Sequence, residues 1–271
     1  MNAFFFYATM GIYFCSSLLY LIYLARPDAK MWKISRAVVA AGFAAHCVFT
    51  VLRYMKAGYT PITNLHESLS FFSLAIVGLF IGFERKYRIA VLGSFVMPVA
   101  LLMMIASCIF PTSIVPLVPA LKSRWLVVHT SMAFFGYAAF TVAFCAGIMY
   151  LIQEHFLKSK KLGPLYRKLP SLDTLDDINY RCLTLGFPLL TIAIITGAIW
   201  AETAWGAYWS WDPKETWSLI TWFVYAALLH GRLTTGWRGR RAAIFAIAGF
   251  CILIFTFLGV NLFLPGLHSY K

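Results

Sequence analysis

The stretch Trp205-Gly-Ala-Tyr-Trp-Ser-Trp-Asp-Pro-Lys-Glu-Thr-Trp217 decides how the rest of this chain is interpreted. Six of the nine tryptophans fall between Trp200 and Trp222. Asp212, Lys214 and Glu215 lie among them, although only 12% of the residues are charged. Such a segment is either an aromatic belt at the headgroup level of a membrane or a platform on which a large planar ligand stacks. The remainder of the chain has to decide between these two interpretations.

The composition is that of an integral membrane protein. The chain has 271 residues, of which 61% are hydrophobic, and its mean hydropathy is +0.76, whereas soluble domains are about 45–50% apolar. The net charge of +13 comes from short basic runs between apolar segments. Basic residues placed in this way orient a chain in the membrane, so we expect no nucleic-acid partner.

The cysteines carry no metal or redox signature. No CxxC pair or Cys/His zinc spacing occurs, so we expect all six to be buried as small hydrophobic residues. They are Cys15, Cys47, Cys108, Cys145, Cys182 and Cys251. The first basic residue, Arg26, follows the first apolar run. A cleaved signal peptide carries positive charge before that run, so we expect the first run to be a retained span.

Eight apolar segments approach the roughly 20 residues that cross a bilayer. They are Phe4–Leu24, Ile34–Leu52, Ser68–Phe83, Ile89–Phe110, Trp125–Ile152, Leu183–Trp200, Trp217–Leu229 and Ala242–Leu264. The third and seventh are short and are expected to extend into their flanks or to lie in a thinned bilayer. The sequence therefore predicts an all-α polytopic protein with about eight transmembrane helices in one membrane domain, residues 1–271.

Basic residues orient these spans. With the N-terminus outside, 17 of the 23 lysines and arginines fall on the inner side. The positive-inside rule then predicts that both termini and the tryptophan-rich segment, residues 201–217, lie outside. Residues 153–182 are expected to form the largest cytoplasmic loop, an amphipathic surface segment.

Two histidines are predicted at the level of the tryptophans. His129 is the fifth residue of its span, roughly 6 Å below the outer end at 1.5 Å per residue, and His268 follows the last span. Two imidazoles beside an indole platform suit the axial positions of a haem iron. The alternatives are an interhelical hydrogen bond for His129 and a solvated tail for His268.

The other four histidines are less well placed for that role. His230 ends its span roughly 20 Å from Trp217, so it belongs to the inner half and lacks a second ligand there. Its alternative is an interfacial position beside Arg232. His46 is deep in a span, where an interhelical hydrogen bond is favoured. It stays a less favoured candidate for the second iron ligand beside His230. A loop contact is favoured for His66 and a solvated position for His155.

The tryptophan-rich run resembles the WWD signature of haem-handling membrane proteins. The ending Gly266-Leu-His-Ser-Tyr270 and the order His129, WWD segment, His230, His268 narrow the resemblance to the CcsA/ResC component of System II cytochrome c biogenesis. The resemblance covers essentially the whole chain. Asn64-Leu-His-Glu-Ser68 is also similar to an outer segment of that family, but His66 stands where the family often has Tyr, so no ligand role is carried onto it.

The resemblance implies a function in haem delivery. Haem b, held noncovalently, would be presented outside so that its vinyl groups join the two thiols of a CxxCH motif in apocytochrome c. The chain would be the WWD-bearing subunit of a holocytochrome c synthase in the bacterial cytoplasmic membrane, in preference to the thylakoid membrane. Its partner would be CcsB/ResB, with thiol-reducing proteins as further partners.

Particular residues receive roles by the same resemblance. His129 and His268 become ligands of the outer haem iron, and His230 becomes a ligand of an inner transit haem whose second ligand comes from the partner. The resemblance implies haem contacts for Trp205, Trp209, Trp211, Asp212 and Trp217. Catalytic residues are not identified.

The chemistry of attachment depends on holding haem still, because oriented groups react with large effective molarities. Haem propionates need cations, and Arg124 and Lys214 are the outer ones available. Asp212, Pro213 and Glu215 are expected to shape the start of the following helix, since Pro suits a first turn and acids complement the dipole. The two acids could alternatively contact the apocytochrome.

Three alternative functions stay open from the sequence. A b-type cytochrome subunit would pair histidines on facing helices and has no use for the WWD segment. A haem chaperone of the CcmC type binds haem at such a segment but hands it to a separate carrier, and it tends to have about six spans. A solute transporter is the third alternative, because polar groups within the membrane also mark transport sites.

Overall fold

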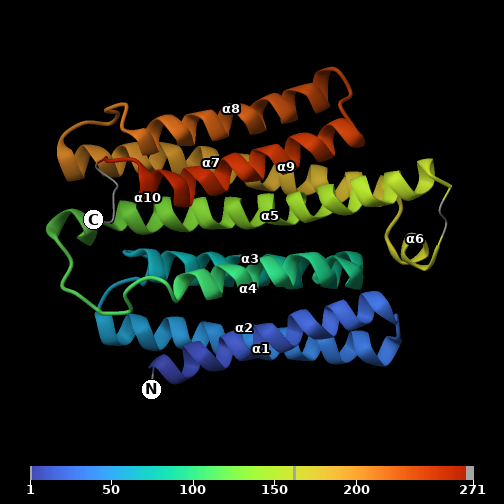
Figure 1. Cartoon of the computed structure of the whole chain (residues 1–271). Helices are drawn as coiled ribbons and strands as arrows, with labels where there is room; N and C mark the ends of the chain where they lie inside the picture. Colours follow the sequence, from blue (N-terminus) through green and yellow to red (C-terminus); the bar gives the residue numbers. More distant parts are fainter. Residues whose placement is uncertain (1, 161–162, 267–271) are drawn as a thin grey trace. The chain divides into compact units, whose positions relative to one another are not determined.

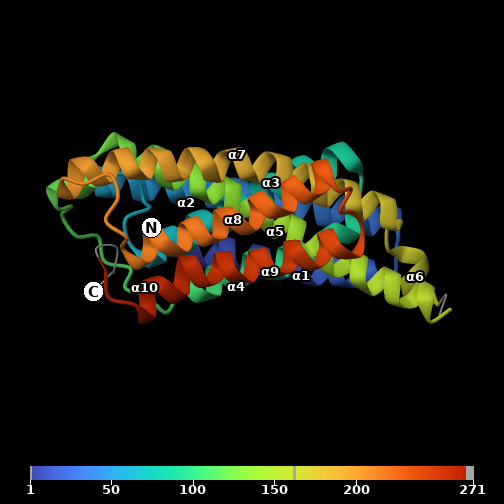
Figure 2. The ribbon, with the colours of Figure 1, turned by 90° about the horizontal axis from the view of Figure 1, so that it is seen from above.

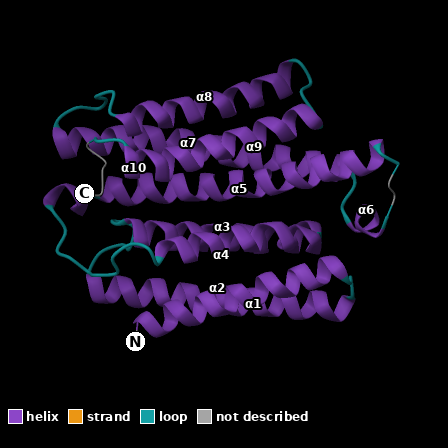
Figure 3. Ribbon diagram, in the orientation of Figure 1, coloured by secondary structure: helices purple, strands orange, loops and turns teal. Residues whose placement is uncertain are grey.

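The computed structural model describes residues 2–160 and 163–266, and every regular element in these two ranges is helical (Figure 3). Among these residues, seven helices are long and apolar enough to cross a membrane. The prediction of a polytopic all-α membrane protein is therefore confirmed. Most of the helices continue beyond the apolar limits read from the sequence, and the short third segment extends at both ends to Leu65–Tyr87. The fourth is an exception, because its α-helix, Gly93–Ser107, lies within the predicted Ile89–Phe110.

The predicted seventh span, Trp217–Leu229, is the segment that falls outside this set of seven. It lies within a regular helix, α8 (Pro213–Thr234). Tryptophan, tyrosine, serine and threonine side chains supply many of its residues, and His230 and Arg232 follow directly. These groups lower the mean hydropathy of the helix although its length, roughly 33 Å, would reach across a bilayer.

The chain divides into two compact units, and each is described by itself. Unit 1 comprises Met1–Val115 and Gln153–Ser171, and unit 2 comprises Pro116–Ile152 and Leu172–Lys271. The long helix α5 (Arg124–Lys158) contributes its last turns to unit 1 and the rest to unit 2. Residues 153–182, expected as one loop, contain the end of α5, the short α6 and the first turns of α7.

Unit 1 is an antiparallel arrangement of helices (Figure 1). Its elements are α1 (Asn2–Ala25), α2 (Ala29–Ala57), α3 (Leu65–Tyr87), η1 (Ala90–Leu92), α4 (Gly93–Ser107) and α6 (Pro164–Lys168). Asp28 and Asn64 cap the starts of α2 and α3 with side-chain oxygens, as N-cap residues do. At the start of α4, Gly93 lets the Tyr20 ring of α1 approach so closely that a Cβ there would lie 2.5 Å from it.

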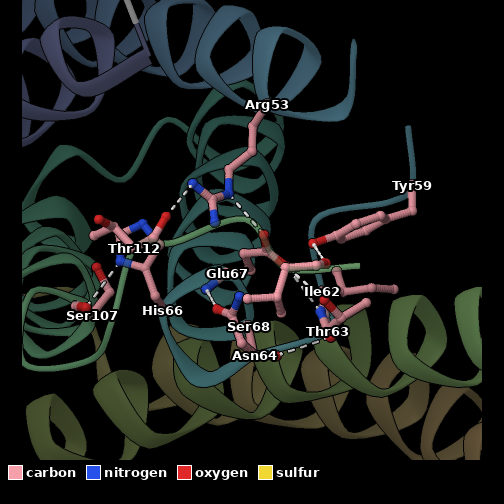
Figure 4. Close-up of polar contacts among 11 residues, drawn as sticks. Arg53, Tyr59, Ile62, Thr63, Asn64, His66, Glu67, Ser68, Ser107 and Thr112 are labelled. Carbon is pink, nitrogen blue, oxygen red and sulfur yellow. Dashed lines mark hydrogen bonds and ion pairs between the residues drawn. The ribbon is translucent and has the colours of Figure 1, made fainter. Parts of the chain in front are cut away.

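A buried ion pair joins α2 to the start of α3 (Figure 4). Arg53 Nε donates to Glu67 Oε1 at 2.8 Å, and Arg53 Nη1 donates to the carbonyl of Thr112 at 3.1 Å. Thr63 donates its backbone N–H and its hydroxyl to the other oxygen of Glu67. Since both charged side chains are almost fully buried, their partners offset the cost of taking the charges out of water.

His46 and His66 both hydrogen-bond inside unit 1. His46 is fully buried, with Nδ1 3.1 Å from the Tyr13 hydroxyl and Nε2 2.9 Å from the Ser70 hydroxyl. Its two ring nitrogens therefore bridge α1 and α3, which is the interhelical role favoured from the sequence. His66 donates from Nδ1 to the carbonyl of Ser107 at 3.0 Å (Figure 4).

Unit 2 holds the tryptophan-rich segment. Its elements are η2 (Pro119–Lys122), most of α5, α7 (Leu172–Trp205), α8, α9 (Arg240–Ile254), η3 (Phe255–Gly259) and α10 (Val260–Phe263). Figures 1 and 2 show α7, α8 and α9 side by side, with the loop between α7 and α8 at the same end as the start of α5. η3 is a π-helical turn through which α9 continues into α10.

The core of unit 2 is set by an aromatic pair and small residues. Phe140 of α5 stacks on Tyr225 of α8 with ring centroids 3.5 Å apart and planes 6° from parallel. Gly186 of α7 faces the Phe140 ring, where a Cβ would lie 2.7 Å from a ring carbon, and Gly249 of α9 faces the Tyr225 ring, where a Cβ would lie at 3.0 Å. Four helices thus meet around two rings in the core of unit 2.

Candidate functional site at the tryptophan-rich end

His129 is fixed in one orientation by α7. Its Nδ1 lies 2.6 Å from the carbonyl oxygen of Ala193, and a carbonyl can only accept a hydrogen bond. Nδ1 therefore carries the proton, and Nε2 is the ring nitrogen with the lone pair. A histidine that ligates a metal is generally oriented in this way by a backbone or carboxylate acceptor.

Two further residues of α7 shape the surroundings of the imidazole. Gly197 passes so close that a Cβ there would lie 2.6 Å from His129 Nδ1. Trp200, one turn further on, lies with its ring 14° from parallel to the imidazole and the centroids 6.4 Å apart. Trp205 then meets Trp200 edge-on at 4.8 Å. The imidazole consequently lies close to the backbone of Gly197 and near the indole ring of Trp200.

The segment between α7 and α8 contains two residues with positive φ and ends in the N-terminal cap of α8. Gly206 and Trp211 have positive φ values of 77° and 60°, which only Gly adopts without cost. Asp212 Oδ2 accepts from Lys214 N, while Glu215 Oε2 accepts from the backbone N–H groups of Asp212 and Ser210. With Pro213 in the first turn, these contacts form a capping box, so the expected helix-shaping role of this triplet is confirmed.

A pocket joins His129 to this segment within unit 2. Its lining comes from α5, from α7, from the loop between α7 and α8, and from the start of α8. The residues are His129, Ala133, Tyr137, Leu190, Ala193, Ile194, Gly197, Ala198, Ala201, Tyr208, Trp209, Lys214, Glu215 and Ser218. Its volume of about 90 Å³ is well below the 300–1,000 Å³ of enclosed ligand pockets.

The six tryptophans separate into different environments. Trp209 lines the pocket and meets Trp211 edge-on at 5.7 Å, while Trp211 itself is 69% exposed. Trp217 packs against Phe255 of η3 at 4.5 Å. Trp222 donates from its indole N–H to the Thr191 hydroxyl, which fixes α8 to α7. The last two therefore hold the helices together, and the others lie around the imidazole or at the surface.

Lys214 points into the bundle. Its Nζ donates to the carbonyl oxygens of Thr256 at 2.9 Å and Phe257 at 3.2 Å. Burial lowers the pKa of Lys214 to about 7, and the nearby Asp212 carboxylate acts in the opposite direction. Arg124, the other proposed propionate partner, is exposed at the start of α5.

The described end of the chain reaches the same place. Gly266 lies against Asp212, and a side chain built at Gly266 would overlap the Oδ1 atom of that carboxylate. His268, predicted as the second outer ligand, lies outside the described residues. The last described residue before it, Gly266, lies beside the N-cap residue of α8.

His230 lies far from this pocket along α8. It is exposed, and its backbone carbonyl accepts from the Thr234 hydroxyl. Near it, Arg232 forms a two-pronged ion pair with Asp176 of α7, at 2.8 and 2.7 Å. The Gly239 N–H also donates to Asp176, so this end of α7, α8 and α9 is clamped by one carboxylate.

Sequence reasoning missed several residues of the pocket. Tyr208, Glu215 and Ser218 line it, although Glu215 was expected to shape the start of α8 or to contact the apocytochrome. One oxygen of Glu215, Oε1, is buried and has no hydrogen-bond partner among the described residues. The small residues Ala193, Gly197 and Ala201 recur every four positions on α7, and this spacing is the signal that could have identified a face closely approached by another group.

Comparison with known proteins gives a consistent result. Residues 62–268 match the family model described as cytochrome C assembly protein. The "Cytochrome c biogenesis protein CcsA" of Synechocystis sp. is 38% identical, covering 89% of this chain and 89% of the relative. The protein of the same name from Chlamydomonas reinhardtii is 43% identical, covering 90% of this chain and 70% of the relative.

A solved structure shares the fold. The "Cytochrome c Heme Lyase CcmF" superposes with a TM-score of 0.69 over 95% of this chain and 46% of the lyase, at 16% identity. At that identity the likeness concerns the fold alone. Together with the family match over most of the chain, the CcsA relatives show that this multi-pass membrane protein belongs to the cytochrome c assembly protein family.

Proposed function

We propose that this member of the cytochrome c assembly family holds haem b noncovalently at the tryptophan-rich end of unit 2 and presents it for attachment to apocytochrome c. The observation that carries the proposal is the His129–Ala193 hydrogen bond beside the indoles. It gives the imidazole the tautomer whose Nε2 can ligate iron. Haem is the substrate here, and attachment makes it covalent.

The lining of the pocket suits one edge of a porphyrin. Three alanines and a glycine of α7 line it together with Leu190 and Ile194, and Tyr137 and Trp209 add aromatic surface. Trp205, Trp211 and Trp217 are proposed to support or extend this surface, together with Asp212 at the start of α8. His268 is proposed as the second iron ligand, because Gly266, two residues earlier, already lies against Asp212.

Attachment of each vinyl group is an addition reaction. A cysteine thiol of the CxxCH motif adds across the vinyl double bond: a C–S bond forms, the S–H bond breaks, and the hydrogen ends on the terminal vinyl carbon. Electrons balance without an oxidant. The chain contributes by holding the haem, because positioning alone supplies large effective molarities, and by excluding water from the iron.

The remaining parts of the proposal concern topology and partners. The distribution of basic residues favours an outer, periplasmic position for the pocket in a bacterial cytoplasmic membrane. We propose His230 as a ligand of an inner transit haem, with the second ligand from a CcsB/ResB partner. His46 does not suit that role, since both of its ring nitrogens already have partners in unit 1.

The test is reconstitution of the chain with its partner subunit, haem and a periplasmic apocytochrome c. We expect covalent haem on the acceptor, detected by staining of the denatured protein, and none when both CxxCH cysteines are replaced by serine. Haem bound to the chain but transferred only to a separate carrier would favour the chaperone alternative. Purified chain without a Soret band after expression with abundant haem would contradict every haem function.

A further inference from the structure

We propose that Lys214 is a positioning residue that ties the tryptophan-rich segment to the π-helical turn η3 and so sets the place of the C-terminal segment that follows it. The inference deepens the proposed function, because that segment leads to His268. It concerns how the start of α8 and the segment that follows η3 are held at fixed positions relative to each other. It does not require that Lys214 touch haem.

The first observation is the irregular backbone of η3. The Val260 N–H bonds the carbonyl of Phe255, five residues back, so the hydrogen-bond ladder departs from the α-helical pattern here. Such π-helical turns leave neighbouring carbonyls displaced, and they are frequent at functional sites. Lys214 Nζ donates to two of these carbonyls, those of Thr256 and Phe257.

The second observation is that α8 meets η3 at more than this one contact. The Thr256 hydroxyl lies 2.8 Å from the Thr221 hydroxyl and 3.2 Å from the Trp217 carbonyl. The Trp217 ring packs on Phe255. One side of α8 thus contacts the five-residue turn η3 at several points. Among these contacts, that of Lys214 is the nearest to the pocket.

The third observation links the same turn to α5. Lys214 Nζ lies 5.6 Å from the centre of the Phe257 ring. That ring meets Phe134 edge-on at 5.3 Å and Tyr137 at 6.2 Å. Phe134 and Tyr137 lie five and eight residues after His129 on α5. Lys214 therefore contacts a turn that packs against α5, the helix that carries His129.

The position of Lys214 explains why the tie affects the C-terminal segment. The chain leaves η3 through α10 and returns to Asp212, two residues before Lys214, at Gly266. Residues 255–266 thus lie next to the start of α8 at both ends, with hydrogen bonds from Lys214 at one end and close approach to Asp212 at the other. Replacing Lys214 removes the hydrogen bonds at the η3 end of this connection that lie nearest to the pocket, and leaves the contacts of Thr221 and Trp217 with η3 in place.

Hydrogen exchange of the full chain in nanodiscs tests the proposal without any haem. The variant is Lys214→Met, and the matched control is Lys122→Met, an exposed lysine of unit 2. We expect exchange of amides in residues 255–266 to rise roughly tenfold or more in Lys214→Met, the scale of losing hydrogen bonds to two backbone carbonyls. Unchanged exchange in that segment would overturn the proposal.

The haem spectrum supplies a second measurement. In haem-loaded Lys214→Met we expect a fall in the low-spin signal of two axial histidines, restored by added imidazole. A propionate-binding role predicts a different result, namely weaker haem binding, unchanged exchange and no rescue by imidazole, and this result also overturns the proposal. If wild-type protein binds no haem but exchange rises in the variant, the proposed function fails while the tie stands. Lys214→Gln repeats both measurements if Lys214→Met does not fold.

Discussion

The Nδ1 atom of His129 and the carbonyl oxygen of Ala193 are 2.6 Å apart, and this contact engages Nδ1 as a hydrogen-bond donor. The acceptor is a backbone atom of a long helix, so no side-chain substitution removes it directly. It can be displaced only by moving α5 or α7. The neighbouring glycine offers a way to do so.

Gly197→Ala is expected to prevent His129 from ligating the haem iron. The new Cβ would lie 2.6 Å from Nδ1, far inside van der Waals contact, so the imidazole or the helix must shift. The change should stabilise an isolated helix by about 0.5–1 kcal/mol, yet haem ligation should be lost. Absorption spectra of haem-loaded protein measure the loss. Gly82→Ala, at an open position of α3, is the control and should keep the wild-type spectrum.

Breaking the Arg53–Glu67 pair is expected to destabilise unit 1. Both side chains are buried, so Arg53→Met leaves the Glu67 carboxylate without its charged partner, at a cost of about 3–5 kcal/mol. Thermal unfolding in detergent measures the effect. The double variant Arg53→Met/Glu67→Leu should regain much of the loss, because it removes both charges. A single variant as stable as wild type would show that the pair contributes nothing.

The stability of the protein is expected to depend on Lys214 between pH 7 and pH 10. Burial lowers the pKa of Lys214 to about 7 in the folded protein, whereas an unfolded chain keeps a lysine proton up to about pH 10.4. Within that window the unfolded state binds more protons, so stability rises with pH and reaches its full gain near pH 10. Melting temperatures of wild type minus Lys214→Met, measured across pH 6–10, should show this rise. A flat difference would mean that Lys214 titrates normally.

The sequence predicted the helices well because membrane spans depend on hydropathy, which is local. It did not predict that α7 begins at Leu172, since the turns before Leu183 are polar and carry Asp173 and Asp176. It also could not divide the helices into two units, because hydropathy says which segments are buried and not which neighbour buries them. The predicted seventh span, Trp217–Leu229, shows the same limit, as α8 is a regular helix of only moderate hydropathy.

For the site, counting residues along the spans predicted that His129 lies at the level of the tryptophans, and in the structure His129 lines one pocket with Trp209 and lies beside Trp200. The individual roles of the tryptophans were beyond sequence reasoning, because residue type does not fix side-chain direction. Trp217 and Trp222 turn toward helix contacts while Trp211 turns outward. The tie from Lys214 to η3 depends on a π-helical turn, which leaves no mark in composition or periodicity.

The most direct test of the central claim is the haem spectrum and attachment yield of His129→Gly, with His155→Gly on the same helix as the control. His155 is exposed, so its replacement should change neither quantity. We predict that His129→Gly loses the low-spin signal of two axial histidines and attaches haem only at background level, and that added imidazole restores both. An unchanged spectrum with full attachment in the absence of imidazole would contradict the assignment of His129 as the outer haem ligand.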